Sequence, residues 1–300
     1  MKLLLNYSGF SIITNIDKFK RKKYLLCMPQ GGLNDQLSII KKCYIYCRLH
    51  NRILLINTTK SCYGVNLSDY IIFIITNDVE IICNLNIIKN IINSHNFTIY
   101  PNIDKNILWT MNMYWTKKGY YIKNIDIYIS SDLNTIYKED ILIYCNCGSD
   151  NPCSILKIIQ FKDNVKNEYI NRLNKIPKPY LAIHIRNTDY KCDYKKLYYD
   201  NEKKILNEKN IYVATDDINA LNFFKSKRNI YNFTTFQNKR TSNNLHYDKS
   251  ISSNTRFMDT LCDLLILGSS YNILTISKGG YIKLAKIICY DKSILYSLLY

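Results

Sequence analysis

Short apolar runs along this chain alternate with longer stretches in which apolar residues recur every three or four positions. YLLCMP (24–29) is such a run and predicts a buried strand, which Gly31-Gly32 would end in a turn. QLSIIKKCYIYCRLHN (36–51) has apolar residues at helical spacing, and RILLIN (52–57) predicts the next strand. A strand, a helix and a strand in this order predict a βαβ unit, which requires a parallel sheet.

The middle of the chain is less regular. Residues 58–135 show no clear period, and we interpret them as the rest of a first domain with insertions. ILIYCN (141–146) predicts a strand, and SILKIIQFKDNVKNEYINRLNKI (154–176) predicts one long helix or two. Pro177 and Pro179 then interrupt the pattern, which indicates a domain junction.

The chain after these prolines repeats the first pattern. Three apolar runs have the length of strands: LAIHI (181–185), IYVAT (211–215) and NILTI (272–276). The residues between them have helical spacing, so we expect a second parallel sheet flanked by helices. The predicted domains are therefore 1–177 and 178–300, and the predicted fold class is α/β.

Composition indicates a globular protein and bears on its partners. Of 300 residues, 47% are hydrophobic and 22% are charged, which differs from the composition of a disordered chain. The formal net charge of +17 fits a polyanionic partner. The lysines are scattered, however, through a sequence rich in Asn, Ile, Lys and Tyr, and they form no patterned stripe. We therefore favour a solubilising role for the charge and expect no nucleic-acid partner, with a small anionic ligand still allowed.

Cysteine usage and hydropathy bear on location. The 11 cysteines are an odd number without a repeating spacing or a CxxC pair, so we expect free thiols in a reducing compartment, the cytoplasm. The N-terminus lacks the pattern of a secretory signal. The most apolar region, which begins at Tyr70, is interrupted by Asn77, Asp78 and Glu80, so we expect no membrane span.

Glycine is scarce in this chain, and two adjacent pairs use four of the nine glycines. Gly31 and Gly32 follow a predicted strand and lead into Asn34, Asp35 and Gln36. Glycine lets backbone N–H groups approach a ligand and supplies positive φ without a steric penalty. Helix capping would explain one of these polar residues but not the whole run. We therefore predict a binding loop here.

The end of the predicted strand 181–185 carries His184 and Arg186, with Asp189 in the turn after it. Because side chains alternate along a strand, His184 and Arg186 point to the same side of the sheet. An arginine there can hold a phosphate through its planar guanidinium group. A buried core histidine and a capping aspartate would explain two of these residues singly, but together the three predict a site.

Two later strand ends carry similar residues. Asp216 and Asp217 are neighbouring carboxylates that cannot both be buried cheaply, so at least one is solvated or bonded to a ligand. Helix capping is the alternative for Asp217. Ser277, Lys278 and Gly279 follow the last predicted strand, an arrangement that suits either anion binding or a plain capped turn.

All these positions can converge on one crevice, because the carboxyl ends of parallel strands meet at one edge of a sheet. The sequence has no DxD motif and no Asp/His/Glu cluster with metal-ligand spacing. A phosphate would then be held by arginine, lysine and backbone groups. The sequence therefore predicts a nucleoside-diphosphate site without a metal.

Four motifs together resemble the fucosyltransferase superfamily. GGLNDQ, HIRNTD, ATDD and DLLILGSSYNILTISKGG occur in the order of the family's GGxGNQ, HxRxxD, TDD and late serine loop. The resemblance is best over 180–290 and covers the first half only through 24–57. It implies a GT-B architecture, with two Rossmann-like domains facing across a cleft. It also implies inverting, metal-independent transfer of fucose from GDP-fucose to a glycan or protein hydroxyl, without a cofactor.

The resemblance also implies roles for single residues. Arg186 would bind the β-phosphate and stabilise the leaving GDP. The other matched positions of the donor site are His184, Asp189, Asp216, Asp217, Asp263 and Ser277. The predicted substrate-binding set further includes Gly31, Gly32, Asn34, Lys278 and Gly279.

Two departures from the family pattern concern the catalytic base. Asp35 stands where the family has an asparagine near the reacting centre, and Tyr194, beside Asp193, stands where the α-1,6 enzymes have a glutamate base. Inverting transfer needs one carboxylate to accept the proton of the acceptor hydroxyl. The predicted base is therefore Asp35 or Asp193.

Other hypotheses stay open at this stage. The protein could be a GT-B transferase of another nucleotide sugar, or an inactive relative that binds a nucleotide or a carbohydrate. In either transferase hypothesis we expect residues 58–135 to determine the acceptor.

Overall fold

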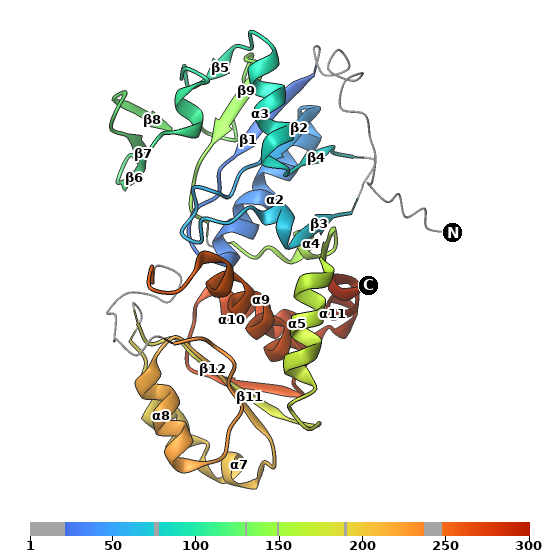
Figure 1. The fold of residues 1–300 in the computed structure, drawn as a ribbon, viewed down its shortest axis with the longest axis vertical. Helices are drawn as coiled ribbons and strands as arrows, with labels where there is room; N and C mark the ends of the chain where they lie inside the picture. Colours follow the sequence, from blue (N-terminus) through green and yellow to red (C-terminus); the bar gives the residue numbers. More distant parts are fainter. Residues whose placement is uncertain (1–21, 75–77, 130, 149, 189–190, 237–247) are drawn as a thin grey trace.

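Two parallel sheets form the framework of the molecule, one in each half of the chain (Figure 1). The computed structural model describes residues 22–300 except 75–77, 130, 149, 189–190 and 237–247. Helices pack around and between the sheets, so the α/β class predicted from the sequence is confirmed.

The first sheet contains five parallel strands in the order β4-β2-β1-β9-β5. These are β1 (Lys23–Cys27), β2 (Arg52–Ile56), β4 (Ile81–Ile82), β5 (Ile99–Tyr100) and β9 (Ile141–Tyr144). Helix α2 (Leu33–Leu49) connects β1 to β2, so the predicted βαβ unit is present. Both faces of β1 are buried, since Tyr24 and Leu26 belong to one apolar cluster and Leu25 and Cys27 to another.

The second sheet contains three parallel strands in the order β12-β11-β13. These are β11 (Leu181–Ile185), β12 (Ile211–Thr215) and β13 (Asn272–Thr275). The helices of this half are α6 (Tyr194–Asp200), α7 (Glu202–Asn207), α8 (Ile218–Lys227), α9 (Ser253–Ser269), α10 (Gly280–Tyr290) and α11 (Lys292–Leu299). No helix in the described part of the chain has the length and apolar character needed to cross a bilayer.

In each sheet, the first strand in the sequence is central, and later strands lie on both sides of it. From β1 the chain adds β2 and β4 on one side and β5 and β9 on the other. From β11 it adds β12 on one side and β13 on the other. The carboxyl end of a strand at such a reversal is where open α/β sheets bind ligands. The topology therefore predicts a ligand site beside the residues that follow β1 and β11.

Residues 58–135, which show no clear period in the sequence, fold into short elements. These are η1 (Leu67–Asp69), β3 (Ile71–Phe73), β4, α3 (Leu85–Ser94), β5, η2 (Ile107–Trp109), β6 (Met113–Thr116), β7 (Gly119–Ile122) and β8 (Ile127–Ile129). Strands β6, β7 and β8 form an antiparallel meander that projects from the side of the first sheet (Figure 1).

The prediction of one long helix or two for 154–176 misses a strand. Helices α4 (Cys153–Leu156) and α5 (Asp163–Leu173) are separated by β10 (Ile159–Phe161), which pairs antiparallel with β3. Ile159 and Phe161 are buried while Gln160 between them is partly exposed, which is the alternation of a strand. A strand this short was hidden by the helical spacing on both sides of it.

One apolar cluster continues from the first half of the chain into the second. It includes residues of β1 and α2 together with residues of α9, α10 and α11. Helix α5 packs against α9, and α11 packs against β10. This packing joins elements from both sides of Pro177 and Pro179, which are themselves exposed, and the division into domains 1–177 and 178–300 stays a prediction.

Candidate active site

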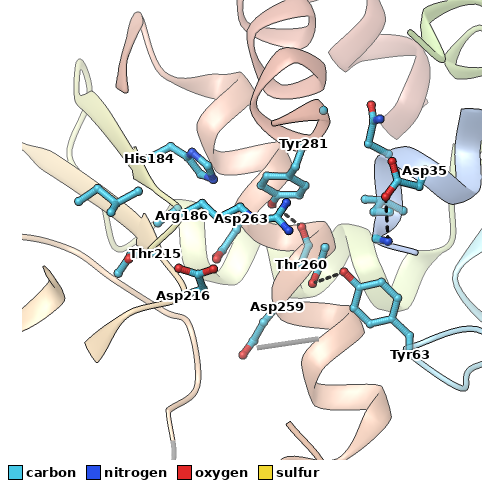
Figure 2. A pocket seen from close by; sticks show the side chains of 16 residues that line it. Asp35, Tyr63, His184, Arg186, Thr215, Asp216, Asp259, Thr260, Asp263 and Tyr281 are labelled. Carbon is cyan, nitrogen blue, oxygen red and sulfur yellow. Dashed lines mark hydrogen bonds between the residues drawn. The ribbon is translucent and has the colours of Figure 1, made fainter. Parts of the chain in front are cut away.

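A pocket lies between the two halves of the molecule, at the carboxyl ends of β1 and β11 (Figure 2). The space within it is about 810 Å³, including the part that is open to solvent. The walls come from the loop between β1 and α2, the loop after β2, the ends of β11 and β12, α9 and the first turn of α10. The pocket therefore lies where the sheet topology favours a ligand.

The first turn of α2 brings Asp35 to one side of the pocket. Gly31 has a φ of +84°, and a Cβ at this position would lie 2.6 Å from Sγ of Cys147, so only glycine fits. Gly32 caps α2, and its N–H group donates to Oδ2 of Asp35 at 3.3 Å. Burial raises the pKa of Asp35 above its ordinary value, although the Gly32 N–H group and the Arg186 charge oppose this shift.

Asn34, in the first half, lies against Gly280 at the start of α10 in the second half. It lines the pocket and is 5% exposed, and its Nδ2 atom has no hydrogen-bond partner among the described residues. A Cβ added to Gly280 would lie 2.2 Å from that Nδ2 atom. Helix α10 thus begins in direct contact with the first turn of α2, and this contact requires a glycine.

The end of β11 brings His184 and Arg186 to the opposite side of the pocket, as Figure 2 shows. The His184 ring lies 5.6 Å from the ring of Tyr281 in α10. Burial, and then the positive charges of Arg186 and Lys286, lower the pKa of His184 to about 3, so its imidazole is neutral at physiological pH. The N–H group of Arg186 donates to Oγ of Ser277 at 3.1 Å, which joins the end of β11 to the loop after β13.

The two carboxylates after β12 hold the turn that follows β11. Asp216 accepts hydrogen bonds from the N–H group of Asn187 and the hydroxyl of Thr188, both at 2.7 Å. Asp217 accepts from the side-chain amide of Asn187 at 2.6 Å, and it caps α8 through the N–H group of Asn219. The capping alternative for Asp217 is therefore observed, and Asp216 is the carboxylate that lines the pocket.

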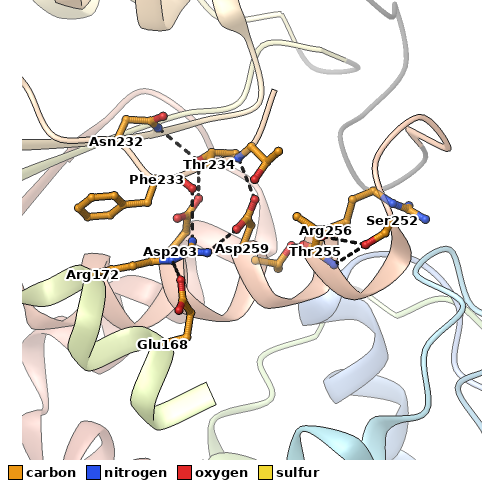
Figure 3. Close-up of polar contacts among 12 residues, drawn as sticks. Glu168, Arg172, Asn232, Phe233, Thr234, Ser252, Thr255, Arg256, Asp259 and Asp263 are labelled. Atoms are coloured by element: carbon orange, nitrogen blue, oxygen red, sulfur yellow. Dashed lines mark hydrogen bonds and ion pairs between the residues drawn. The ribbon is translucent and has the colours of Figure 1, made fainter. Parts of the chain in front are cut away.

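Helix α9 contributes two buried aspartates, Asp259 and Asp263, which also line the pocket. Asp259 forms an ion pair with Arg172 of α5 at 2.7 Å (Figure 3). Asp263 accepts hydrogen bonds from the hydroxyls of Tyr212 at 2.5 Å and Thr234 at 2.8 Å. Burial raises the pKa of Asp263 to about 6.

Several pocket residues were not predicted from the sequence. Asp259 lies four positions before Asp263, so helical spacing could have placed both on one face of α9. Tyr63, Thr260 and Tyr281 also line the pocket, and Thr260 donates to the Tyr63 hydroxyl at 3.3 Å and accepts, at its backbone carbonyl, from Tyr281 at 2.8 Å. Nothing in the sequence distinguishes these two tyrosines from the rest of the 27.

Other predicted site residues lie apart from the pocket. Asp193 is exposed, caps α6 through the N–H group of Lys196, and does not line the pocket formed by the described residues. Ser277 accepts the hydrogen bond from the backbone N–H group of Arg186. Lys278 is exposed, and Gly279 lies beside the Arg186 guanidinium group. Asp189 lies outside the described residues. The roles of all these residues in binding and catalysis stay predictions.

Within the described ranges, no group of three or more His, Cys, Asp or Glu side chains is placed to hold a metal ion.

Comparison with known proteins identifies the fold. No protein-family model matches the sequence, and no curated protein matches it. Among solved structures, NodZ α-1,6-fucosyltransferase of Bradyrhizobium, soaked with GDP-fucose, is similar with a TM-score of 0.60 at 12% identity, over 89% of this chain and 93% of that one. The chain has the GT-B fold of the fucosyltransferases. POFUT1 in complex with GDP shares this fold with a TM-score of 0.52 at 10% identity, over 89% of this chain and 95% of that one.

A plant protein shares the fucosyltransferase fold as well. A mutant of Arabidopsis thaliana FUT1 in complex with GDP is similar with a TM-score of 0.51 at 11% identity, over 91% of this chain and 72% of that one. The GT-B architecture expected from the motif resemblance is therefore confirmed. Because the identities are this low, the comparison establishes the fold, and function has to be argued from the site.

Proposed function

We propose that the protein is an inverting, metal-independent glycosyltransferase that transfers fucose from GDP-fucose to a hydroxyl group of a glycan or a protein. The observation that carries this proposal is the placement of Asp35 and Arg186 on opposite sides of one pocket, each supplied by a different half of the GT-B fold. GDP-fucose and GDP are the ligands of the NodZ and POFUT1 structures with this fold. The absence of a DxD motif from the sequence supports a reaction without a metal.

In the proposed reaction the acceptor oxygen attacks the anomeric carbon of fucose while the bond to the GDP oxygen breaks. The guanidinium group of Arg186 neutralises the charge that develops on the departing diphosphate. His184 stays neutral beside it, because burial and the Arg186 charge hold its pKa low. The fixed positive charge is therefore supplied by Arg186.

The proton of the acceptor hydroxyl passes to a carboxylate in this scheme. Asp35 lines the pocket, while Asp193 caps α6 at an exposed position, so the geometry favours Asp35 as the base. Burial raises the pKa of Asp35, which strengthens it as a proton acceptor. Since only the ionised carboxylate can act, kcat/KM should fall as the pH drops through this raised pKa.

A ligand screen provides the first test of the proposal. GDP should raise the melting temperature more than UDP, dTDP or ADP, and the increase should survive EDTA, because ligand-linked stabilisation follows the logarithm of concentration over Kd. Stabilisation that EDTA removes would contradict metal independence. An equal response to all four nucleotides would favour a transferase of another nucleotide sugar. GDP binding without release of GDP from GDP-fucose would indicate an inactive nucleotide-binding relative.

Substitutions of the two pocket residues provide the second test. Arg186→Lys keeps the charge but loses the planar fork, and should lower the transfer rate roughly a hundredfold, or about 2–4 kcal/mol of transition-state stabilisation. Asp35→Asn should abolish transfer while GDP still binds. Asp193→Asn is the matched control and should transfer at the wild-type rate. If Asp193→Asn is the inactive variant and Asp35→Asn is active, the base is assigned wrongly.

The proposal also includes a compartment. All eleven cysteines carry free thiols in this structure. This supports the proposal that the protein works in a reducing compartment such as the cytoplasm.

A further inference from the structure

The meander of β6, β7 and β8 has one exposed face that the fold itself does not use. Most of its other face is buried, since Ile122 belongs to the apolar cluster beside the first sheet and Met113 and Ile127 pack against it, while Trp115 on that face is 63% exposed. The residues that alternate with them therefore point toward solvent.

Three tyrosines occupy neighbouring positions on this outer face. Tyr114 of β6 is directly opposite Tyr121 of β7, and Tyr121 is directly opposite Tyr128 of β8. Tyr114 is 54% exposed and Tyr128 is 37% exposed. The Tyr121 and Tyr128 rings lie 4.8 Å apart at an angle of 38°. We call these three residues the tyrosine row. Single exposed aromatic residues are common on proteins, but an aligned row across three strands places three rings on one face.

Lysines flank the tyrosine row on both sides. Lys117 and Lys118 are exposed in the turn between β6 and β7, and Lys123 is exposed in the turn between β7 and β8, at the other end of the strands. The one acidic residue between 111 and 129 is Asp126, which accepts a hydrogen bond from the Tyr121 hydroxyl at 2.9 Å. The row thus lies between positive charges, with a local excess of three lysines over one aspartate.

We propose that the tyrosine row and its flanking lysines bind an anionic oligosaccharide, which would be a glycan acceptor of the proposed transferase. Aromatic rings pack against the C–H groups on the flat face of a sugar, and tyrosine adds a hydroxyl for hydrogen bonding. The lysines attract carboxylate, phosphate or sulfate groups on the same chain. This inference rests on the proposed function for the choice of a glycan as the partner. It also gives a physical basis to the expectation that 58–135 determines the acceptor.

Single-stranded nucleic acid is the competing partner, because bases also stack on aromatic rings and phosphates also attract lysine. A binding experiment by calorimetry with defined probes separates the two. The probes are a hyaluronan hexasaccharide, which carries carboxylates, the neutral chitohexaose, and a thymidine oligonucleotide. We expect the hyaluronan fragment to bind more tightly than the other two probes, with an affinity that falls as salt is added.

Variants of the row test where the probe binds. Replacing Tyr114 and Tyr128 together by alanine should weaken hyaluronan binding about tenfold, since two ring contacts are lost. The matching double phenylalanine variant keeps the rings and should retain most of the affinity. Lys117→Gln with Lys118→Gln should weaken binding and reduce its salt dependence. Tyr296→Ala removes a tyrosine that is 66% exposed on α11 and should bind as the wild type does.

The outcomes separate this inference from the proposed function. None of the substituted residues lines the pocket, so GDP should stabilise every variant to the same extent. If hyaluronan binds but GDP does not, the proposed transferase function is wrong, and the tyrosine row is still an oligosaccharide-binding surface. The inference is overturned if hyaluronan does not bind the wild type, if binding survives the double alanine substitution, or if chitohexaose or the oligonucleotide binds as tightly.

Discussion

Asp263 is a buried carboxyl group with two hydrogen-bond donors and with the charges of Asp259 and Arg172 nearby. Its two oxygens accept from the hydroxyls of Tyr212 and Thr234, and burial raises its pKa from 3.8 to about 6. The folded protein therefore binds this proton more tightly than the unfolded chain does. The stability that protonated Asp263 contributes is present at low pH and is lost as the pH rises through about 6.

Replacing Asp263 with asparagine should remove this pH dependence while keeping an acceptor for Tyr212. Between about pH 5 and about pH 7, the wild type should lose about 1 kcal/mol more of its unfolding free energy than Asp263→Asn does. Urea unfolding of both proteins at the two pH values measures the difference. Equal changes in the two proteins would show that Asp263 has an ordinary pKa.

His184 acts in the opposite direction and is shared by both proteins of that comparison. Its pKa is lowered to about 3, mainly by burial, so the stability contributed by the neutral ring is present above about pH 6.5 and is lost as the pH falls toward 3. The two groups partly cancel in the wild type. For this reason the difference between wild type and variant is the informative quantity.

At the scale of elements, the start of α10 against α2 sets how closely the two halves approach. Gly279 and Gly280 are adjacent, yet their surroundings differ. A Cβ at Gly280 would lie 2.2 Å from Nδ2 of Asn34, whereas a Cβ at Gly279 would meet Nη1 of Arg186 at 3.6 Å, an ordinary contact. Only the second of the two glycines is therefore required by packing.

Gly280→Ala should force α10 away from the first turn of α2. We expect it to lower the unfolding free energy by about 1–3 kcal/mol, the usual effect of overpacking, and to weaken GDP binding because Asn34 is displaced. Gly279→Ala serves as the control and should change stability much less. Urea unfolding and the GDP-dependent melting temperature measure both effects. If the unfolding free energy and GDP binding of Gly280→Ala are unchanged, the contact between α10 and Asn34 accommodates the added methyl group without a shift of the helix.

The sequence pattern predicts some of the elements and pocket residues but not others. Runs such as those of β1, β2 and β11 are apolar on both faces, and the end of β11 and the start of α2 carry His184, Arg186 and Asp35, so both sheets and part of the pocket follow from the pattern. Strand β10 was missed because its three residues give too short a period. Tyr63 and Thr260 reach the pocket only through the packing of α9 on the first half, which no local pattern encodes.

At the scale of the whole molecule, the two halves share a continuous apolar interior. The ring of Phe257 in α9 lies 4.9 Å from that of Tyr63 and 4.8 Å from that of Tyr70, and both tyrosines belong to the first half. The Tyr70 hydroxyl also donates to Oδ1 of Asn254 at 3.0 Å. The start of α9 is therefore anchored in the first half although its chain belongs to the second.

This packing predicts that the protein unfolds as one cooperative unit. Calorimetry should show one thermal transition, which GDP moves to higher temperature as a whole. Phe257→Ala should lower the unfolding free energy by about 3–5 kcal/mol, because it leaves a cavity where the halves meet. Two separate transitions in the wild type would contradict the prediction and would support independent domains at 1–177 and 178–300.

Helix α11 covers β10, and this contact has a consequence for the order of synthesis. Ile159 and Phe161 leave the ribosome well before Ile294 and Leu298, the α11 residues of the same apolar cluster. At ordinary elongation rates the delay is on the order of ten seconds. During that time the nascent first half lacks the helix that packs on β10 in the folded protein. Its folding is therefore completed by a helix translated after the entire second sheet, and until then this face is available to chaperones.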